Sequence, residues 1–186
     1  MPHLIPNPVK DGTVALRPWS ADDTDAIVLR INDPEIGAYL DLIPQPYTTA
    51  DALDWLAISA QGWRDGTSGT FGIHTDGLDG AVGGVGVRFL SGLEEGSAEI
   101  GYWVAAEARG RGVATAATRL AARWSFDSVP ELGRLQLRAD VENVASNRVA
   151  EKAGFTREGV LRAQRYNARL GRRTDFVMWS LLREEL

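Results

Sequence analysis

The stretch Arg109-Gly110-Arg111-Gly112-Val113-Ala114-Thr115 lies between an alternating segment and a strongly amphipathic one. Its two glycines allow backbone N–H groups to approach an anion without interference from a Cβ atom. The start of a helix adds unpaired amides and the positive end of its dipole. Arg109 and Arg111 add charge-assisted hydrogen bonds suited to phosphate. The stretch therefore predicts a cradle for a pyrophosphate, with a glycine-rich turn that carries solvated arginines as the alternative.

Two common nucleotide-binding motifs do not fit this stretch. A dinucleotide fingerprint that begins at Gly110 requires a small residue at the position of Thr115. A phosphate loop of the Walker type requires Gly-Lys followed by Ser or Thr, and that tripeptide does not occur in the chain. The cradle therefore belongs to another class of protein.

The patterns on either side predict the elements that hold the cradle. Residues 99–104 alternate as a strand, and apolar residues then recur at helical spacing from Val113 to Trp124. Residues 135–141 alternate as the next strand, and a helix over 144–153 ends at Gly154. Further out we expect a strand at 13–17, helices that begin near Ser20, Asp33 and Thr48 or Thr49, a hairpin over 71–89, and strands at 160–165 and 175–182. This order predicts an α+β protein with a mixed sheet and no doubly wound half.

Composition predicts one globular domain that spans residues 1–186. The length of 186 residues is typical of a single domain, and the 44% of hydrophobic residues supplies a core. Cysteine is absent, which excludes disulfides, thiolate metal sites and a cysteine-bound acyl intermediate. The two histidines, His3 and His74, are too few and too isolated for a zinc site or a serine–histidine triad. We therefore expect no metal.

Charge and hydropathy predict a soluble cytoplasmic protein. The balance of 20 basic and 25 acidic residues gives −5, which argues against a nucleic-acid partner. No segment approaches the ~18 consecutive apolar residues that suggest a membrane span. Residues 1–8 contain prolines and no apolar run before a cleavage site, so we expect no signal peptide and no membrane partner.

The pattern Arg-x-x-Gly-x-Ala at 109–114 resembles the acyl-CoA pyrophosphate loop of the GNAT N-acetyltransferase superfamily. Within it the chain most resembles the RimJ/RimL-type branch, which includes the ribosomal-protein N-terminal acetyltransferases. The similar stretches follow one another in the family's order and spacing. They are Leu16-Arg17-Pro18, Pro46-Tyr47-Thr48, Trp55-Leu56, Glu99-Ile100-Gly101-Tyr102-Trp103, Asn143-x-x-Ser146-x-Arg148-Val149-Ala150-Glu151-Lys152-x-Gly154-Phe155, Glu158-Gly159-x-x-Arg162, Asp175 and Trp179-Ser180-Leu181-Leu182.

The resemblance implies a GNAT-like fold with acetyl-CoA as co-substrate. The fold is a mixed, mostly antiparallel sheet of about seven strands, flanked by about four helices and splayed between the strands at 99–104 and 135–141. A pantetheine arm bonds to such an exposed strand edge like an added strand. The resemblance implies that the main chain of Trp103 and Val104 and the side chain of Asn143 bind the pantetheine arm. It also implies that the Val104 N–H stabilises the oxyanion formed from the thioester. It assigns the pyrophosphate to Arg109, Gly110, Arg111, Gly112, Val113, Ala114 and Thr115.

Transfer of an acyl group to an amine also requires a neutral amine and a proton for the departing thiolate. Glu99 is the candidate base, directly or through water, with an ordinary strand carboxylate as the alternative. Ser146 is the candidate proton donor, with a helix-start hydroxyl as the alternative. Many members of the superfamily carry a Tyr where this chain has Ala150, which favours Ser146. Some ribosomal-type relatives carry a Glu base where this chain has Arg165, which leaves Glu99 or water to accept the proton.

The sequence thus predicts an acetyl-CoA-dependent N-acetyltransferase that acts by direct attack in a ternary complex. The expected acceptor is a primary amine, either a protein or peptide N-terminus or a small amine. The alternatives are a catalytically weak CoA-binding or regulatory module and a loop that binds some other anion. The oligomeric state is left open, with a homodimer among the alternatives.

No sequence motif identifies the residues near the acceptor. Tyr47 and Tyr166 are the candidates to line an acceptor pocket, and the acidic loop around Asp41 and Asp51 is expected near its entrance. The tryptophans at helical apolar positions are expected in the core instead, namely Trp55, Trp63 and Trp124.

Overall fold

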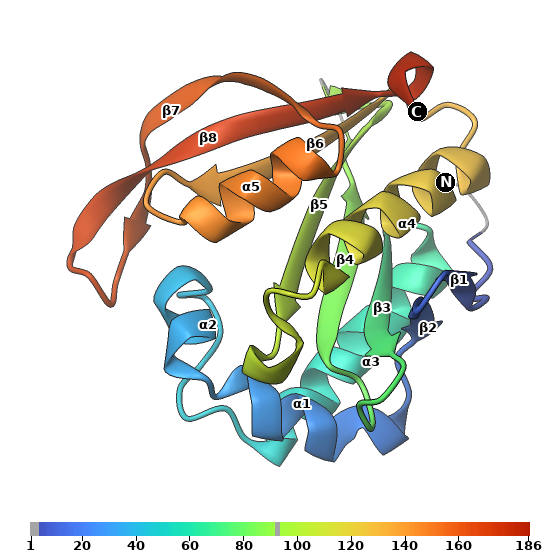
Figure 1. Ribbon diagram of the computed structural model, residues 1–186, viewed down its shortest axis with the longest axis vertical. Helices are drawn as coiled ribbons and strands as arrows, with labels where there is room; N and C mark the ends of the chain where they lie inside the picture. Colours follow the sequence, from blue (N-terminus) through green and yellow to red (C-terminus); the bar gives the residue numbers. More distant parts are fainter. Residues whose placement is uncertain (1–3, 92–93) are drawn as a thin grey trace.

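The strands of the protein form one mixed sheet. The computed structural model describes residues 4–91 and 94–186, so His3 lies outside it. In these ranges eight strands pair in the order β1-β2-β3-β4-β5-β6-β8-β7 (Figure 1). Their bounds are β1 Val9–Asp11, β2 Val14–Pro18, β3 Ser68–Thr75, β4 Gly83–Phe89, β5 Ser97–Val104, β6 Arg134–Asp140, β7 Thr156–Asn167 and β8 Arg172–Leu182. The additional strand is β1, because three residues are too few to show an alternating pattern.

Five α-helices connect the strands in the described part of the chain. They are α1 Thr24–Ile31, α2 Pro34–Tyr39, α3 Thr49–Asp65, α4 Val113–Ser128 and α5 Val144–Lys152. Short polar side chains begin three of them, since each accepts a hydrogen bond from a first-turn amide. Asp33 caps α2, Thr48 caps α3 and Asn143 caps α5. The residue that ends α3, Gly66, has a φ of 67°, in the left-handed region that favours glycine.

A single pair of neighbouring strands in the described sheet is parallel. β5 and β6 run in the same direction, with α4 as the connection between them, whereas the other neighbours are antiparallel. Figure 1 shows α4 and α5 on one face of the sheet and α3 on the other. The predicted fold, a mostly antiparallel mixed sheet with a central splay, is confirmed.

Two apolar clusters hold the layers together. The large one fills the space between the sheet and α4, and it buries Trp63 and Trp124 in edge contact with each other, as their helical positions predict. The smaller one joins α1, α2 and the start of α3 around Ile27, Ile31 and Tyr47. None of the helices within residues 4–91 and 94–186 is long and apolar enough to cross a membrane.

Candidate active site

The parallel strands β5 and β6 part in the middle of the sheet (Figure 1). Their ladder covers Ser97 to Glu99 opposite Arg134 to Gln136, and the strands diverge beyond it. The Ala105 N–H donates to the Val82 carbonyl at 2.9 Å, toward β4. Because neighbouring N–H groups along a strand point to opposite sides, the Val104 N–H points into the gap. The splay therefore exposes the donor that the resemblance assigns to the oxyanion.

The glycine loop opens directly onto the start of α4. Gly110 and Gly112 have φ values of 71° and 78°, and a Cβ atom at either position would meet nothing within 4 Å. The first helical hydrogen bond of α4 runs from the Ala116 N–H to the Gly112 carbonyl at 3.0 Å. The amides of Val113, Ala114 and Thr115 therefore lie in the first turn, where a helix offers donors without helical partners. This geometry suits an anion that approaches the backbone closely.

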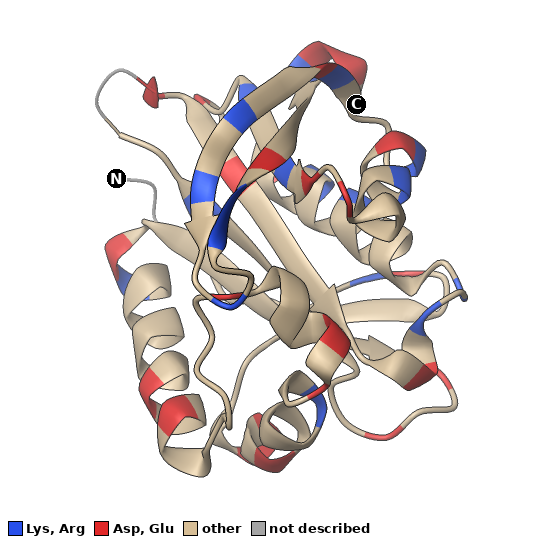
Figure 2. Cartoon of the chain, turned by 90° about the vertical axis from the view of Figure 1, so that its left-hand side faces the viewer, with Lys and Arg blue, Asp and Glu red and all other residues tan. Residues whose placement is uncertain are grey.

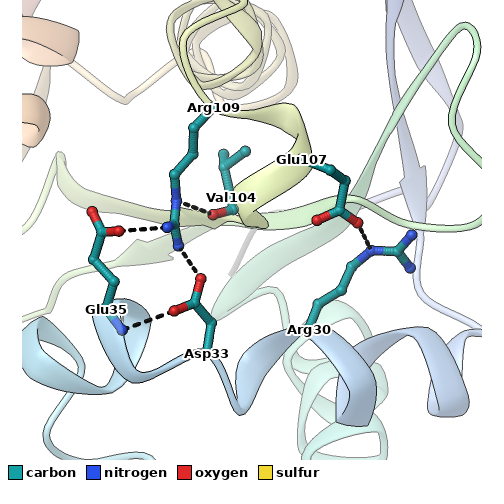
Figure 3. A network of polar contacts seen from close by, with 6 residues as sticks. All are labelled: Arg30, Asp33, Glu35, Val104, Glu107 and Arg109. Carbon is teal, nitrogen blue, oxygen red and sulfur yellow. Dashed lines mark hydrogen bonds and ion pairs between the residues drawn. The ribbon is translucent and has the colours of Figure 1, made fainter.

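The side chain of Arg109 has partners that the sequence did not indicate. Its guanidinium donates to Asp33 at 2.7 Å, to Glu35 at 2.6 Å and, through Nε, to the Val104 carbonyl at 3.1 Å (Figure 3). We expected this group to bind phosphate, and that role stays a prediction. In the structure the guanidinium pairs with the α1–α2 region and with the end of β5.

A cavity of about 620 Å³ joins the splay to the loop. Of the residues assigned to the site from the sequence, Arg111 is the one that does not line it. The others come together there although they are far apart in the chain: Glu99, Trp103, Val104, Arg109, Gly110, Gly112, Val113, Ala114, Thr115, Asn143 and Ser146. We call this space the cofactor cavity.

Ser146 shares a hydrogen bond with a residue that the sequence analysis did not select. Its Oγ atom lies 2.9 Å from the Oη atom of Tyr102, which reaches across the splay from β5. Burial raises the pKa of Tyr102 above its ordinary value, and the bond to Ser146 lowers it by less. The Tyr102 hydroxyl therefore keeps its proton at neutral pH, and either hydroxyl can be the donor in this bond. Asn143 positions Ser146, because its Oδ1 accepts from the Ser146 N–H at 2.9 Å, and its Nδ2 takes no part in that cap.

Glu99 lies between two guanidinium groups. Its carboxylate accepts from Arg138 Nη2 at 2.6 and 2.7 Å and from Arg88 Nη2 at 2.9 Å. The three residues come from adjacent strands, β4, β5 and β6. Both oxygens of this carboxylate are therefore engaged by arginines.

A second cavity, of about 610 Å³, lies on the other side of β5. Its walls are mainly apolar and aromatic. They come from α1, α3, β4, β5 and the loops after β2 and before α3, and they include Trp19, Ile27, Ile31, Tyr47, Trp55 and Trp103. Tyr47 lines it as expected, and so does Asp51 near the start of α3, where Figure 2 shows acidic positions. We call this space the acceptor cavity, after the use proposed for it below.

Three other residues considered for the acceptor side differ in where they lie. Trp55 packs against the smaller apolar cluster, but it also lines this cavity and contacts Trp19 edge-on at 5.3 Å. Tyr166 is 57% exposed and lines neither cavity. The buried carboxylate of Asp41 pairs with Arg165 at 2.8 Å, whereas its neighbours Leu40 and Leu42 line the cavity.

Comparison with known proteins identifies this arrangement. Residues 13–156 match the family model described as the acetyltransferase (GNAT) domain. The chain belongs to the GNAT family. It is similar to the uncharacterized N-acetyltransferase p20 of Bacillus licheniformis, with 29% identity over 173 residues that cover 92% of this chain and 94% of that protein. This GNAT protein is an acetyl-CoA-dependent N-acetyltransferase.

Solved structures agree with the family assignment. Mycobacterium smegmatis RimJ in complex with CoA-disulfide superposes with a TM-score of 0.85 at 26% identity, over 97% of this chain and 90% of that one. RimL, a ribosomal L7/L12 alpha-N-protein acetyltransferase in complex with coenzyme A, shares the fold with a TM-score of 0.80 at 19% identity, over 92% of this chain and 95% of that one.

The residues of this GNAT protein fit the co-substrate. The open space above Gly110 and Gly112 leaves room for a pyrophosphate against the backbone, and the unpaired edge of β5 leaves room for an extended arm. When bound, acetyl-CoA supplies the activated acetyl group. Within the described residues no group of three metal-ligating side chains occurs.

Two features of the site could not be recognised from motifs alone. Tyr102 belongs to the stretch that carries the resemblance, but its link to Ser146 spans 44 positions in the chain. The acceptor cavity combines tryptophans from three separate segments, and each of them also fits an ordinary core position. No local signal in the sequence distinguishes these roles.

Proposed function

We propose that this N-acetyltransferase acetylates a primary amine that enters the acceptor cavity and attacks the thioester directly. The observation that carries the proposal is the contact between the two cavities. Glu99, Gly101, Tyr102 and Trp103 line both of them, so that β5 forms a shared wall. An amine and a thioester that approach β5 from opposite sides are brought together at this wall.

In direct attack, every bond and proton of the reaction is accounted for without a covalent enzyme intermediate. The amine nitrogen forms a C–N bond with the thioester carbonyl carbon, the C–S bond breaks, the amine loses a proton and the departing thiolate gains one. The chain contains no cysteine that could carry the acetyl group. Both substrates must therefore be present together.

The backbone supports the acyl group and the pyrophosphate. We assign the pyrophosphate to the amides from Gly110 to Thr115 and to Arg111, which belongs to the loop and is exposed. The arm is assigned to the main chain of Trp103 and Val104 and to the Nδ2 of Asn143, because the cap of α5 uses only the Oδ1 atom of that side chain. The Val104 N–H stabilises the oxyanion because it points into the splay. Arg109 supports this strand end through the Val104 carbonyl.

Ser146 gives the proton to the departing thiolate. Tyr102 holds the Ser146 hydroxyl at 2.9 Å and keeps its own proton at neutral pH, so the pair supplies two hydroxyl groups in series. This arrangement supports Ser146 over a serine that only caps a helix, since the cap of α5 is made by Asn143.

Glu99 attracts and orients the amine rather than deprotonating it alone. Its ion pairs with Arg138 and Arg88 fix the position of the side chain, whose oxygen lone pairs can accept an N–H bond from the amine. The proton then leaves through water. Glu99→Gln is expected to raise the KM for the amine more than it lowers kcat. A large loss of kcat with a shifted acidic limb of the pH profile would instead make Glu99 the base.

The acceptor cavity favours an amine that carries an apolar group. Indole and aliphatic side chains form most of its walls, and Asp51 and Asp54 add negative charge on α3. Both a peptide N-terminus with an apolar first residue and a small apolar amine meet this description. RimL is named a protein acetyltransferase, and its shared fold supports the peptide. The Arg165–Asp41 pair stands where ribosomal-type relatives were expected to carry an acid, which supports the small amine.

A release assay for CoA thiol tests the proposal. The panel contains peptides with apolar, polar and acidic first residues, apolar small amines, polyamines and amino acids, each with acetyl-CoA. We expect turnover of at least one apolar amine or peptide, together with micromolar binding of acetyl-CoA by calorimetry. Acetylation of a hydroxyl acceptor with no amine turned over would contradict the proposal.

A further inference from the structure

The α1–α2 region contacts the segment before the glycine loop through three ion pairs, one of which has the opposite polarity to the other two (Figure 3). Arg30 of α1 donates to Glu107 at 2.7 Å, so the cation lies on the helix side. Arg109 donates to Asp33 at 2.7 Å and to Glu35 at 2.6 Å, so here the cation lies on the loop side. We call these five residues the double latch.

The reversed polarity allows one position of the helices against the loop. A displacement that moved Arg30 toward Arg109 would bring two positive charges together. It would also separate the three ion pairs of the double latch. The side chain of Arg30 is 13% exposed and also donates to the Asp79 carbonyl at 3.0 Å. The pair of Arg109 and Asp33, whose side chains are 30% and 22% exposed, is screened less by salt than a fully exposed pair. The latch therefore fixes the position of the α1–α2 region as well as its attachment.

The double latch joins the cofactor loop to α1, and its α2 residue Glu35 lines the cofactor cavity itself. On the loop side, Arg109 directly precedes Gly110 and also holds the Val104 carbonyl at the end of β5. On the helix side, Ile27 and Ile31 of α1 form part of the wall of the acceptor cavity, and α1 contributes no residue to the cofactor cavity. The latch is thus a direct connection between the cofactor loop and the acceptor wall.

We infer that the double latch couples the two binding events: CoA on the glycine loop steadies α1 through Glu107 and Arg109, and thereby completes the acceptor cavity. A ligand that orders the loop also restrains the residues paired with it, so the second ligand loses less conformational entropy when it binds. Coupling is reciprocal, so the acceptor in turn tightens CoA binding. Arg30, Asp33 and Glu107 are positioning residues in this scheme. The inference rests on the CoA site of the proposed function.

Hydrogen exchange of the α1 amides, with and without CoA, tests the coupling. Because α1 does not line the cofactor cavity, direct contact with CoA cannot protect it. The test variant is Asp33→Asn with Glu107→Gln. Asparagine keeps the cap of α2, since its side-chain oxygen accepts the same bond from the Glu35 N–H. The matched control is Asp11→Asn, which removes a carboxylate from an exposed pair with Arg123 outside both cavities.

In the wild type and in the control, saturating CoA is expected to slow exchange in α1 by at least about fivefold, the lower end of ordinary coupling between sites. In the double variant, CoA still protects the glycine loop, but the slowing in α1 is lost. A latch with a purely structural role would speed exchange in α1 equally with and without CoA. That result, or equal protection of α1 in the wild type and the double variant, overturns the coupling. Failure of the wild type to bind CoA overturns the proposed function and the coupling with it.

Discussion

The cofactor cavity and the acceptor cavity share β5 but are built in different ways. The binding groups proposed for the cofactor cavity come from the backbone of one continuous segment, from Gly110 to Thr115, and from one strand edge. The acceptor cavity takes side chains from α1, α3, β4, β5 and the loops after β2 and before α3. Backbone amides at a helix start serve any sequence that forms the turn, whereas a wall of side chains changes with each residue. The cofactor half therefore defines the family, and the acceptor half defines the individual enzyme.

The largest effect is expected where the two cavities meet. Ser146→Ala removes the proposed proton donor and should lower kcat by ~10²-fold or more, within the range of general acid–base groups. Tyr102→Phe should lower kcat less, because Ser146 remains. Calorimetry should show the Kd of CoA unchanged in both variants, since neither residue is assigned to the cofactor. Full turnover in both would remove the proton-donor assignment.

A smaller effect is expected within the cofactor half. Arg111→Glu should weaken CoA and 3′-dephospho-CoA alike by about 10–100-fold, because a charge-assisted hydrogen bond contributes about 1.5–3 kcal/mol. Arg109→Gln should weaken both ligands by less, since its guanidinium is paired with Asp33 and Glu35. If calorimetry showed a larger loss of affinity for Arg109→Gln than for Arg111→Glu, Arg109 would be the residue that binds the pyrophosphate.

The acceptor half offers a comparison within one helix. Trp55 and Trp63 both lie on α3, but Trp55 lines the acceptor cavity and Trp63 is buried against Phe71. Trp55→Phe should raise the KM of the accepted amine several-fold with an unchanged Kd for CoA. Trp63→Phe should lower the melting temperature without changing KM. Equal changes of KM in both variants would mean that the cavity does not select the acceptor through its walls.

The smallest effect is expected for an ion pair that lies outside both cavities. Its loss should change stability slightly and leave catalysis unchanged, so it serves as a reference for the other variants. Arg134 binds the Glu158 carboxylate through two bonds of 2.6 Å and, with Ser180, lowers the pKa of Glu158 to about 2. A lowered pKa stabilises the folded state above the unfolded value of 4.5, and this contribution is lost as the pH falls toward 2. Because Glu158 is 40% exposed, screening reduces the contribution to about 1 kcal/mol or less.

Urea unfolding of wild type and Glu158→Gln measures this contribution. The difference in the free energy of unfolding should be present at pH 7 and shrink between pH 4.5 and pH 2. Catalysis by the variant should match the wild type at pH 7. A difference in stability that stays constant down to pH 2 would contradict the assignment of the low pKa.

Most of the fold could be predicted because the patterns that specify it are local. The caps at Asp33, Thr48 and Asn143 and the left-handed Gly66 and Gly154 act within one turn of chain. The short strand β1 was missed because three residues do not establish a period. The splay was expected only through the family resemblance, since no local pattern reports where two strands cease to pair.

The sequence by itself determined the glycine loop, the helix behind it and the family, because adjacent residues place adjacent amides wherever the chain goes. Tertiary structure alone decided what the side chains do. It pairs Arg109 with Asp33 and Glu35, which lie 76 and 74 positions away in the chain, although the position of Arg109 beside the glycine loop suggested phosphate binding. It set Tyr102 on Ser146, placed Glu99 between two arginines and turned Trp55 from a core position into a cavity wall. Long side chains choose their partners by proximity and charge in space, and that proximity exists only after the sheet and helices have packed.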